Sequence, residues 1–67
     1  MLRTKIAKNI KKFRKKKKWS QEVLSRKSHI SYNTIIKIES GKIKNPRLDT
    51  ALSIARAFSV SLDKLVK

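Results

Sequence analysis

The chain has 67 residues and no cysteine, so it is one small domain that no disulfide or thiolate metal site can stabilise. Nineteen lysines and arginines against four acidic residues give a formal net charge of +15, which indicates a polyanionic partner such as DNA, RNA or an anionic membrane surface. No apolar run approaches the roughly 20 residues of a membrane span, and the N-terminus lacks the apolar stretch of a signal peptide. We therefore expect a cytoplasmic, nucleoid-associated protein.

The apolar spacing predicts a first helix over residues 4–17. Ile6, Ile10 and Phe13 recur at i, i+4 and i+7, which gives a narrow apolar stripe. Residues 11–18 hold seven basic side chains in eight positions, and their mutual repulsion works against a longer helix. This basic run is either a solvated helix face or a patch that contacts a polyanion.

Capping residues divide the rest of the chain into four short helices. We expect helices over about 20–28, 31–40 and 48–58, followed by a short helix after Ser61. Gly41 suits the left-handed backbone that ends the third helix. The fold class is therefore all-α, a compact domain of five helices with short joins. The candidate N-caps are Thr4, Ser20, Ser31 and Ser61.

Residues 20–41 have the layout of a helix-turn-helix, with a helix, a three-residue break and a second helix. The segments SQEVLSRKSHISYNTIIKIESGK and NPRLDTALSIARAFSVSLDKL resemble the λ-repressor-like family, also called the Cro/repressor or XRE type. This resemblance extends over residues 6–66. It implies that residues 1–67 are a single helix-turn-helix DNA-binding domain. Such domains bind operators, usually as dimers, with the third helix in the major groove.

The chain departs from the family pattern at its turns. The family often has glycine where this chain has Lys18 and His29, and alanine is more usual than Ser25 and Ser28. A left-handed backbone costs a residue other than glycine roughly 1 kcal/mol, and histidine is tolerated there better than most residues. We expect the fold to survive these differences, and we interpret the single histidine as a turn residue and not as a metal ligand.

The third helix carries the expected recognition surface. With Ile35 and Ile38 facing the core, the opposite side of the helix is free to meet a partner. Asn33 can pair with adenine and Lys37 with guanine. For Ile36 three interpretations stay open: contact with a thymine methyl group, an exposed side chain without a role, or a protein contact. The expected base contacts are Tyr32, Asn33, Ile36 and Lys37.

Contacts with the DNA backbone are expected at the edges of the motif. By resemblance, Gln21 at the start of the second helix approaches a phosphate, helped by the amides of the helix N-terminus. An arginine at the position of Arg47 enters the minor groove in some phage repressors. The set expected at the backbone or minor groove is Gln21, Ser31, Ser40, Lys42 and Arg47.

We also expect a structural ion pair between Arg14 and Glu39. The other three acidic residues lie in the first turns of helices, where the helix dipole favours them, but Glu39 lies near a helix C-terminus. Both residues border the core by their spacing from Ile10 and Ile35. The matching positions carry an Arg–Glu pair in some phage repressors, which is an implication of the resemblance.

The leading hypothesis is a sequence-specific DNA-binding transcriptional regulator, namely a repressor that binds a pseudo-palindromic operator as a homodimer. We expect no cofactor, no metal, no small-molecule ligand and no enzyme activity, because the sequence shows no nucleophile–base pair. The dimer interface is expected around Leu65 and Val66, apolar residues near the end of the chain.

Three alternatives stay open. The charge alone would suit a non-specific nucleic-acid-binding protein. A short regulator of this kind could also be an antitoxin-type repressor partnered with a toxin. The first helix alone has the amphipathic character of a membrane-surface element, although its apolar stripe is narrow.

Overall fold

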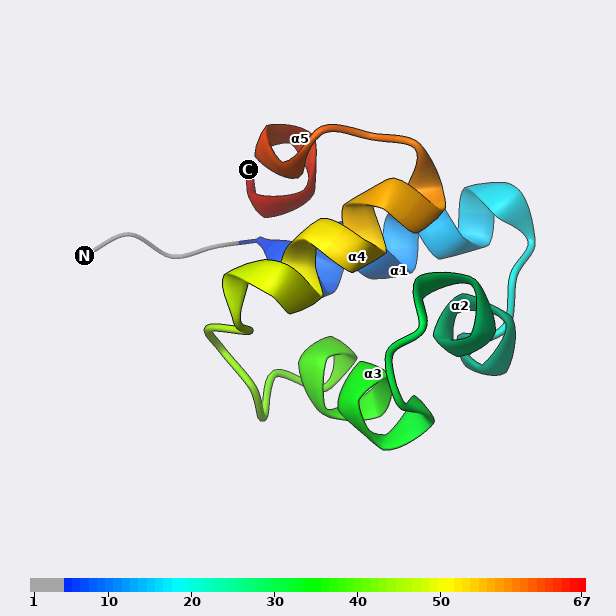
Figure 1. Ribbon diagram of the computed structural model, residues 1–67, viewed down its shortest axis with the longest axis horizontal. Helices are drawn as coiled ribbons and strands as arrows, with labels where there is room; N and C mark the ends of the chain where they lie inside the picture. Colours follow the sequence, from blue (N-terminus) through cyan, green and yellow to red (C-terminus); the bar gives the residue numbers. More distant parts are fainter. Residues whose placement is uncertain (1–4) are drawn as a thin grey trace.

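The computed structural model describes residues 5–67. Within that range the chain forms five α-helices and no strand, which confirms the expected all-α, five-helix fold (Figure 1). Three helices lie within one residue of the expected bounds, and a short fifth helix follows Ser61 as expected. The helices are α1 (Ile6–Lys17), α2 (Gln21–Ser28), α3 (Tyr32–Glu39), α4 (Leu48–Phe58) and α5 (Leu62–Val66).

The first helix begins later than the sequence suggested. It starts at Ile6 and not at residue 4, since Lys5 has the non-helical backbone angles φ −100° and ψ 28°. The backbone N–H of Lys5 donates to the carbonyl of Val66 at 3.2 Å. Asn9, in the first turn of α1, adds a second link, since its Nδ2 donates to the carbonyl of Leu65 at 2.8 Å. These bonds fasten α5 to the start of α1. Thr4, the expected cap, lies outside the described residues.

A single core is shared by all five helices. Helix α1 packs against α3 and α5, α4 packs against α2 and α5, and α2 packs against α3. The helix-turn-helix pair α2–α3 therefore lies on one side of α1 and α4, and α5 lies on the other (Figure 1). The buried apolar residues are Ile6, Ile10, Leu24, Ile35, Ile38, Ala51, Ile54, Ala55, Phe58 and Leu65.

Three aromatic rings pack together near the C-terminal end of α1. The Phe58 ring lies 5.6 Å from the Phe13 ring and 5.5 Å from the Trp19 ring, measured between centroids. The ammonium groups of Lys17 and Lys27 lie 5.4 and 5.2 Å from the Trp19 ring centroid. Such cation–π contacts keep charged groups at the surface while their stems cover the indole.

Three of the helices begin with a serine cap, as expected. Each hydroxyl oxygen accepts a hydrogen bond from the backbone N–H three residues further on, at 3.1 Å for Ser20 and 3.2 Å for Ser31 and Ser61. A cap of this kind contributes about 1 kcal/mol to the stability of a helix. The caps therefore place the starts of α2 and α3, the two helices of the motif, at defined residues.

The turn between α2 and α3 uses the two serines that depart from the family pattern. Ser25 Oγ donates to the carbonyl of Ile30 at 2.6 Å, and Ser28 Oγ donates to the carbonyl of Leu24 at 2.7 Å. Ser28 is buried, so an unpaired hydroxyl there would be costly. Both serines are satisfied, and the first ties α2 to the chain that leads into α3.

Helices α1, α2 and α4 end in left-handed backbone at residues other than glycine. The φ angles are 58° at Lys18, 59° at His29 and 58° at Ser59, and Gly41 after α3 has φ 86°. The expected turn roles of His29 and Gly41 are confirmed. Ser59 was not expected. The backbone N–H of each of the three caps donates to a carbonyl in the last helical turn, which offsets the steric cost.

Replacing His29 by glycine is expected to stabilise the domain by about 0.5–1 kcal/mol, because glycine adopts this backbone without a Cβ clash. The His29 side chain is exposed, so its loss removes little packing. Urea unfolding followed by Trp19 fluorescence measures the effect, and His29→Ala is the matched control because it keeps the Cβ. A glycine variant no more stable than the alanine variant would contradict the prediction.

No helix within residues 5–67 combines the length and the apolar character needed to cross a bilayer.

Candidate nucleic-acid interface

The outward face of α3 is polar and open to solvent. Asn33 and Lys37 are both exposed and lie four residues apart, a spacing that places them on one face of a helix. Ile35 and Ile38 are fully buried on the other side, which fixes the rotation of α3 about its own axis. The face therefore presents an amide, which donates and accepts hydrogen bonds, beside an ammonium group, which donates them.

Two larger side chains of α3 lie at the borders of this face. Tyr32 is 43% exposed, whereas Ile36 is half-buried. Ile36 belongs neither to the buried core cluster nor to the apolar residues packed against it. It is therefore not a core residue of the described chain, and part of its side chain stays available to a partner.

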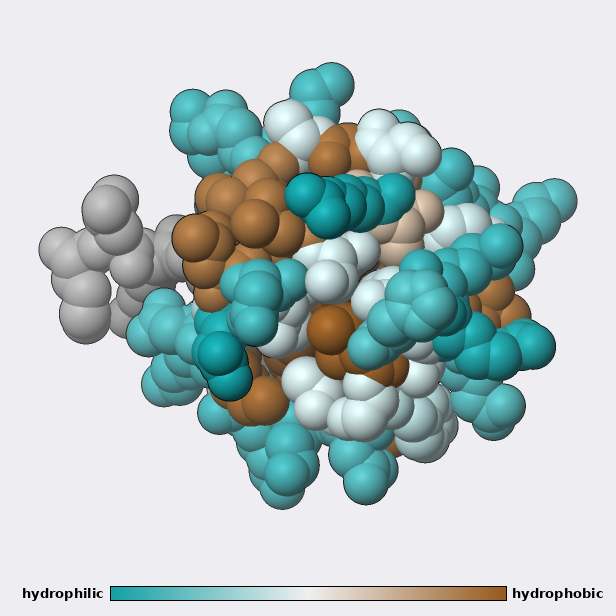
Figure 2. Space-filling model, in the orientation of Figure 1, coloured by the Kyte–Doolittle hydropathy of each residue, from teal (hydrophilic) through white to brown (hydrophobic). Residues whose placement is uncertain are grey.

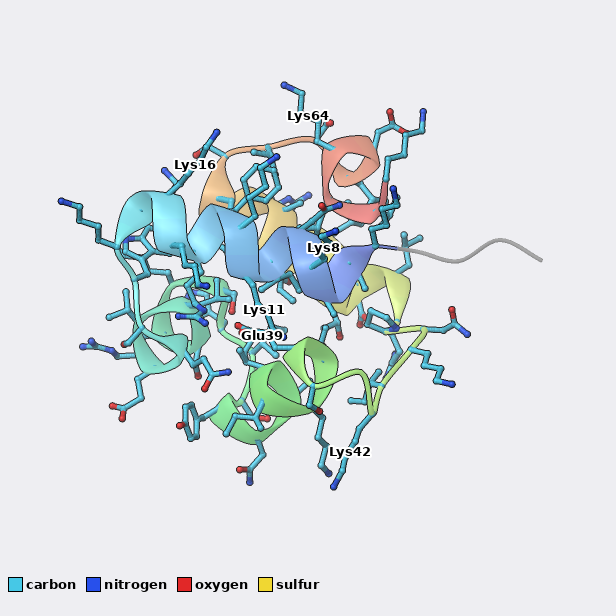
Figure 3. The ribbon with its side chains drawn as sticks, turned by 180° about the vertical axis from the view of Figure 1, so that it is seen from behind. Lys8, Lys11, Lys16, Glu39, Lys42 and Lys64 are labelled. Carbon is cyan, nitrogen blue, oxygen red and sulfur yellow. The ribbon has the colours of Figure 1, made fainter. Side chains whose placement is uncertain are left out.

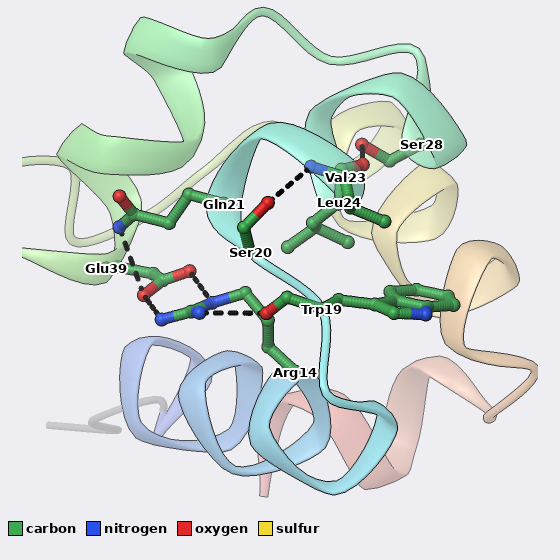
Figure 4. A network of polar contacts seen from close by, with 8 residues as sticks. All are labelled: Arg14, Trp19, Ser20, Gln21, Val23, Leu24, Ser28 and Glu39. Atoms are coloured by element: carbon green, nitrogen blue, oxygen red, sulfur yellow. Dashed lines mark hydrogen bonds and ion pairs between the residues drawn. The ribbon is translucent and has the colours of Figure 1, made fainter.

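A buried charge network holds α3 against α1 (Figure 4). Arg14 and Glu39 form the expected ion pair in a bidentate geometry: Arg14 Nε lies 3.0 Å from Glu39 Oε2, and Arg14 Nη2 lies 3.0 Å from Glu39 Oε1. The third nitrogen, Nη1, donates to the carbonyl of Trp19 at 3.0 Å. The Glu39 side chain is only 3% exposed and that of Arg14 18%. Paired guanidinium and carboxylate groups are stronger and more directional than neutral hydrogen bonds.

Gln21 joins the same network from the first position of α2. Its Nε2 donates to Glu39 Oε1 at 3.3 Å, so a single carboxylate contacts both α1 and α2 from the end of α3 (Figure 4). A primary amide carries two N–H donors, and this bond leaves one for another partner. Sequence reasoning placed Gln21 at a phosphate but missed its bond to Glu39, because nothing in the local spacing links residues 21 and 39.

The turn after α3 presents Ser40 and Lys42 at the surface. Ser40 Oγ donates to the carbonyl of Lys37 at 3.1 Å and accepts from the backbone N–H of Lys42 at 3.4 Å. Both residues are exposed, and Figure 3 shows Lys42 extending from the edge of the domain formed by α3. The ammonium group thus lies at the margin of the polar face.

Two further expected contact residues have local partners. Ser31 is exposed, and its hydroxyl lies 2.7 Å from Thr34 Oγ1 in addition to capping α3. The side chain of Arg47 is 84% exposed, and its Nε lies 3.5 Å from Asp49 Oδ1 of the adjoining helix. An exposed pair at that distance is weak. The Arg47 guanidinium therefore has little to hold it in one position.

The sequence matches known proteins along most of its length. A family model described as helix-turn-helix matches residues 10–65. An uncharacterized HTH-type transcriptional regulator of Rickettsia prowazekii (strain Madrid E) is 30% identical over 69 residues, which cover 98% of this chain and 75% of that protein. The chain belongs to the Cro/C1-type helix-turn-helix family. Members of this family are DNA-binding transcription regulators and not a class of enzymes. No solved structure matches the chain significantly.

For a Cro/C1-type domain, the residues divide into two groups. The polar face of α3, the start of α2 and the turn after α3 form the candidate nucleic-acid interface. The buried network of Arg14, Glu39 and Gln21 sets the positions of α2 and α3 behind it. Within residues 5–67 no group of three or more histidine, cysteine, aspartate or glutamate side chains is placed to hold a metal ion.

Of the two residues expected at a dimer interface, the structure rules out Leu65, while the location of the interface stays a prediction. Leu65 is fully buried in the core of its own domain, and Val66 is half-buried against that core. The expectation treated these residues as uncovered because they lie near the chain end, but the bonds from Lys5 and Asn9 fold α5 onto α1. Leu48, which is 65% exposed at the start of α4, is the more accessible apolar side chain.

Proposed function

We propose that this Cro/C1-type protein is a sequence-specific transcriptional repressor that inserts α3 into the major groove of a pseudo-palindromic operator. The observation that carries the proposal is the exposed Asn33–Lys37 face of α3, held in register by buried isoleucines and by Glu39 on the reverse side. A rigid helix with base-reading side chains on one face is what major-groove recognition requires.

Each side chain of the face suits a particular base edge. The Asn33 amide can bond adenine at N6 and N7, and the Lys37 ammonium can bond guanine at O6 and N7. The partly exposed Ile36 offers methyl groups to a thymine methyl, which carries sequence information without a hydrogen bond. Tyr32, at the border of the face, would contact a base or a neighbouring phosphate through its hydroxyl.

The edges of the motif supply the positioning contacts. Gln21 and the amides at the start of α2 would bind one phosphate, while Ser31, Ser40 and Lys42 flank α3 and would bind others. Arg47, loosely held and highly exposed, is suited to reach into the minor groove. Phosphate contacts fix the orientation of the helix on DNA but carry no sequence information.

A homodimer on DNA is part of the proposal. Half-sites on one face of the duplex lie roughly 34 Å apart. The domain measures 32 × 22 × 20 Å, so two copies fit side by side at that spacing. Figure 2 shows apolar side chains gathered over α5 and the start of α4, where Leu48 lies, and we assign the dimer contact to this surface.

Leu48→Asp is expected to weaken self-association at least about tenfold, because burying a leucine contributes about 1.5–3 kcal/mol and a carboxylate would have to be desolvated in its place. Sedimentation velocity measures the dimer fraction with and without operator DNA. Ser59→Asp is the matched control, since it adds the same charge at the exposed far end of α4. An unchanged dimer in Leu48→Asp would refute the assigned interface.

Selection of bound sequences from a random DNA pool tests the proposed function. We expect enrichment of two inverted half-sites whose centres lie about 10 bp apart or a multiple of that distance. The alternative, a protein that binds nucleic acid without sequence preference, is favoured by the net charge of +15 and would enrich nothing. Failure to enrich any sequence at a salt concentration where the protein binds DNA would overturn the proposal.

A further inference from the structure

A second cationic surface lies on α1, apart from the candidate interface. Four lysines form it, and we call them the α1 outer stripe: Lys8, Lys12, Lys15 and Lys16. All four are exposed, and α1 contains no acidic residue. Asp63 of α5 borders this surface: it lines a shallow hollow with Lys12 and Lys64 and pairs with Lys67 at 3.2 Å.

The α1 outer stripe points away from the core and from α3. At 100° per residue, Lys8 and Lys15 lie opposite the buried Ile6–Ile10 side of α1, whereas Arg14 turns toward Glu39 of α3. Figure 3 looks onto α1 from outside: Lys16 and Lys64 extend at one edge of the domain, and Lys42 extends at the opposite edge beyond α3. The two cationic surfaces therefore face different directions.

The arrangement of these lysines costs stability in the free protein. Lys8 and Lys12, like Lys12 and Lys16, are four residues apart, and like charges at that spacing destabilise a helix. The candidate interface does not use them. An anionic partner on the α1 outer stripe would relieve the repulsion and release its own counterions.

The side chains of the α1 outer stripe suit a DNA duplex better than a membrane surface or a single strand. Its lysines span roughly 12 Å along the helix, at 1.5 Å per residue, and the side chains can follow the phosphates of one duplex strand. Helices that lie on a membrane surface combine basic side chains with exposed apolar anchors. The exposed large hydrophobic residues of the described chain are Tyr32 and Leu48, on other elements. Single strands would need exposed aromatic rings for stacking, and the stripe has none.

We propose that the α1 outer stripe binds the phosphate backbone of a second DNA duplex, so that one protein links an operator to another DNA segment. The domain is 20 Å thick in its shortest dimension. Screening at physiological salt acts over about 8 Å, which is less than the shortest dimension of the domain, so two duplexes on surfaces that face different directions repel each other little. The proposal rests on the proposed function in one respect, since α3 must hold the first duplex, but it does not depend on the sequence preference of α3.

Capture of one duplex by another tests this proposal. An unlabelled duplex is fixed to beads, the full chain is added, and retention of a fluorescent duplex of unrelated random sequence is measured at low salt. The variant Lys8→Gln/Lys12→Gln/Lys15→Gln is expected to retain about tenfold less of the second duplex, since three phosphate contacts are lost. The control Lys18→Gln/Arg26→Gln/Arg56→Gln removes the same charge from exposed positions elsewhere and should retain the wild-type amount within about threefold.

A titration of one duplex by both triple variants locates the contact. If the α1 outer stripe serves a second duplex, the salt dependence of binding to a single duplex stays as in the wild type. A slope reduced by about 2.7, from three contacts at about 0.9 each, would place the stripe on the operator duplex and overturn the proposal.

Three other results would also overturn it. One is failure of the wild type to capture the second duplex. Another is retention of the second duplex at the wild-type level by the triple stripe variant, because a dimer that binds one duplex on each of its two α3 helices would explain that result. The third is stripe-dependent binding to vesicles of phosphatidylserine and phosphatidylcholine without capture of DNA. The capture assay uses duplexes of random sequence, so it can succeed even if the selection enriches no operator. A failure of the proposed function can therefore be told apart from a failure of this proposal.

Discussion

Glu39→Ala is expected to lower the free energy of unfolding by about 3 kcal/mol, because it leaves the Arg14 guanidinium largely buried without its carboxylate. Glu39 is 3% exposed and accepts bonds from both α1 and α2, so the loss also frees Gln21. A 67-residue domain has a total stability of roughly 3–10 kcal/mol, so the variant should be marginally folded. Thermal and urea unfolding of the variant and the wild type measure the difference.

A double-mutant cycle separates this pair from ordinary packing. The cycle compares Arg14→Met, Glu39→Leu and the double variant with the wild type. The double variant removes both charges, and such apolar replacements are often neutral or stabilising, so it should recover most of the loss caused by either single change. The coupling energy should exceed about 0.5 kcal/mol. Asp63→Asn, which breaks an exposed pair with Lys67, is the control and should leave the midpoint nearly unchanged. Additive single and double changes would show that the network does not hold α3.

Asn33→Ala and Lys37→Ala are expected to cost about 1–3 kcal/mol each in operator affinity and to relax the preference at one or two base pairs. Both side chains are exposed, so the fold should keep its stability. Competition binding with duplexes mutated at each operator position measures the preference. If either variant weakens all sequences equally, that side chain contacts the backbone and not a base.

Lys42→Ala is the matched control for these variants, because it removes an exposed charge from the turn after α3. It should weaken operator and random DNA alike and reduce the salt slope by about one. Ile36→Ala should lose discrimination at a thymine while the unfolding midpoint stays close to the wild type. A lowered midpoint with an unchanged base preference would place Ile36 in the packing of the domain.

Local patterns in the sequence were sufficient for most of the fold. The spacing of Ile35 and Ile38 determined which face of α3 is buried, and serine caps determined where α2, α3 and α5 begin. These features depend only on residues within one or two helical turns of one another. A serine cap and the N–H group that it accepts from, for example, are three residues apart. The Arg14–Glu39 pair needed more, because its partners are 25 residues apart: the spacing placed each residue at the border of the core, and the resemblance supported pairing them.

The errors arose where distant segments cover one another. Leu65 was expected at a surface because it lies near the chain end, but its burial depends on α1 packing against α5. The left-handed backbone at Ser59 has no marker in its residue type, since serine is not typical of that conformation. The bond from Gln21 to Glu39 likewise depends on how α2 and α3 meet, which residue spacing does not encode.

The affinity ratio between the selected operator and a shuffled duplex of equal composition, at the same salt concentration, tests the central claim most directly. Recognition through the α3 face predicts a ratio of about 10³ or more for the wild-type protein. It also predicts that Asn33→Ala reduces this ratio more than Lys42→Ala does. A wild-type ratio below about ten would contradict the account, because non-specific attraction to phosphates would then supply essentially all of the binding.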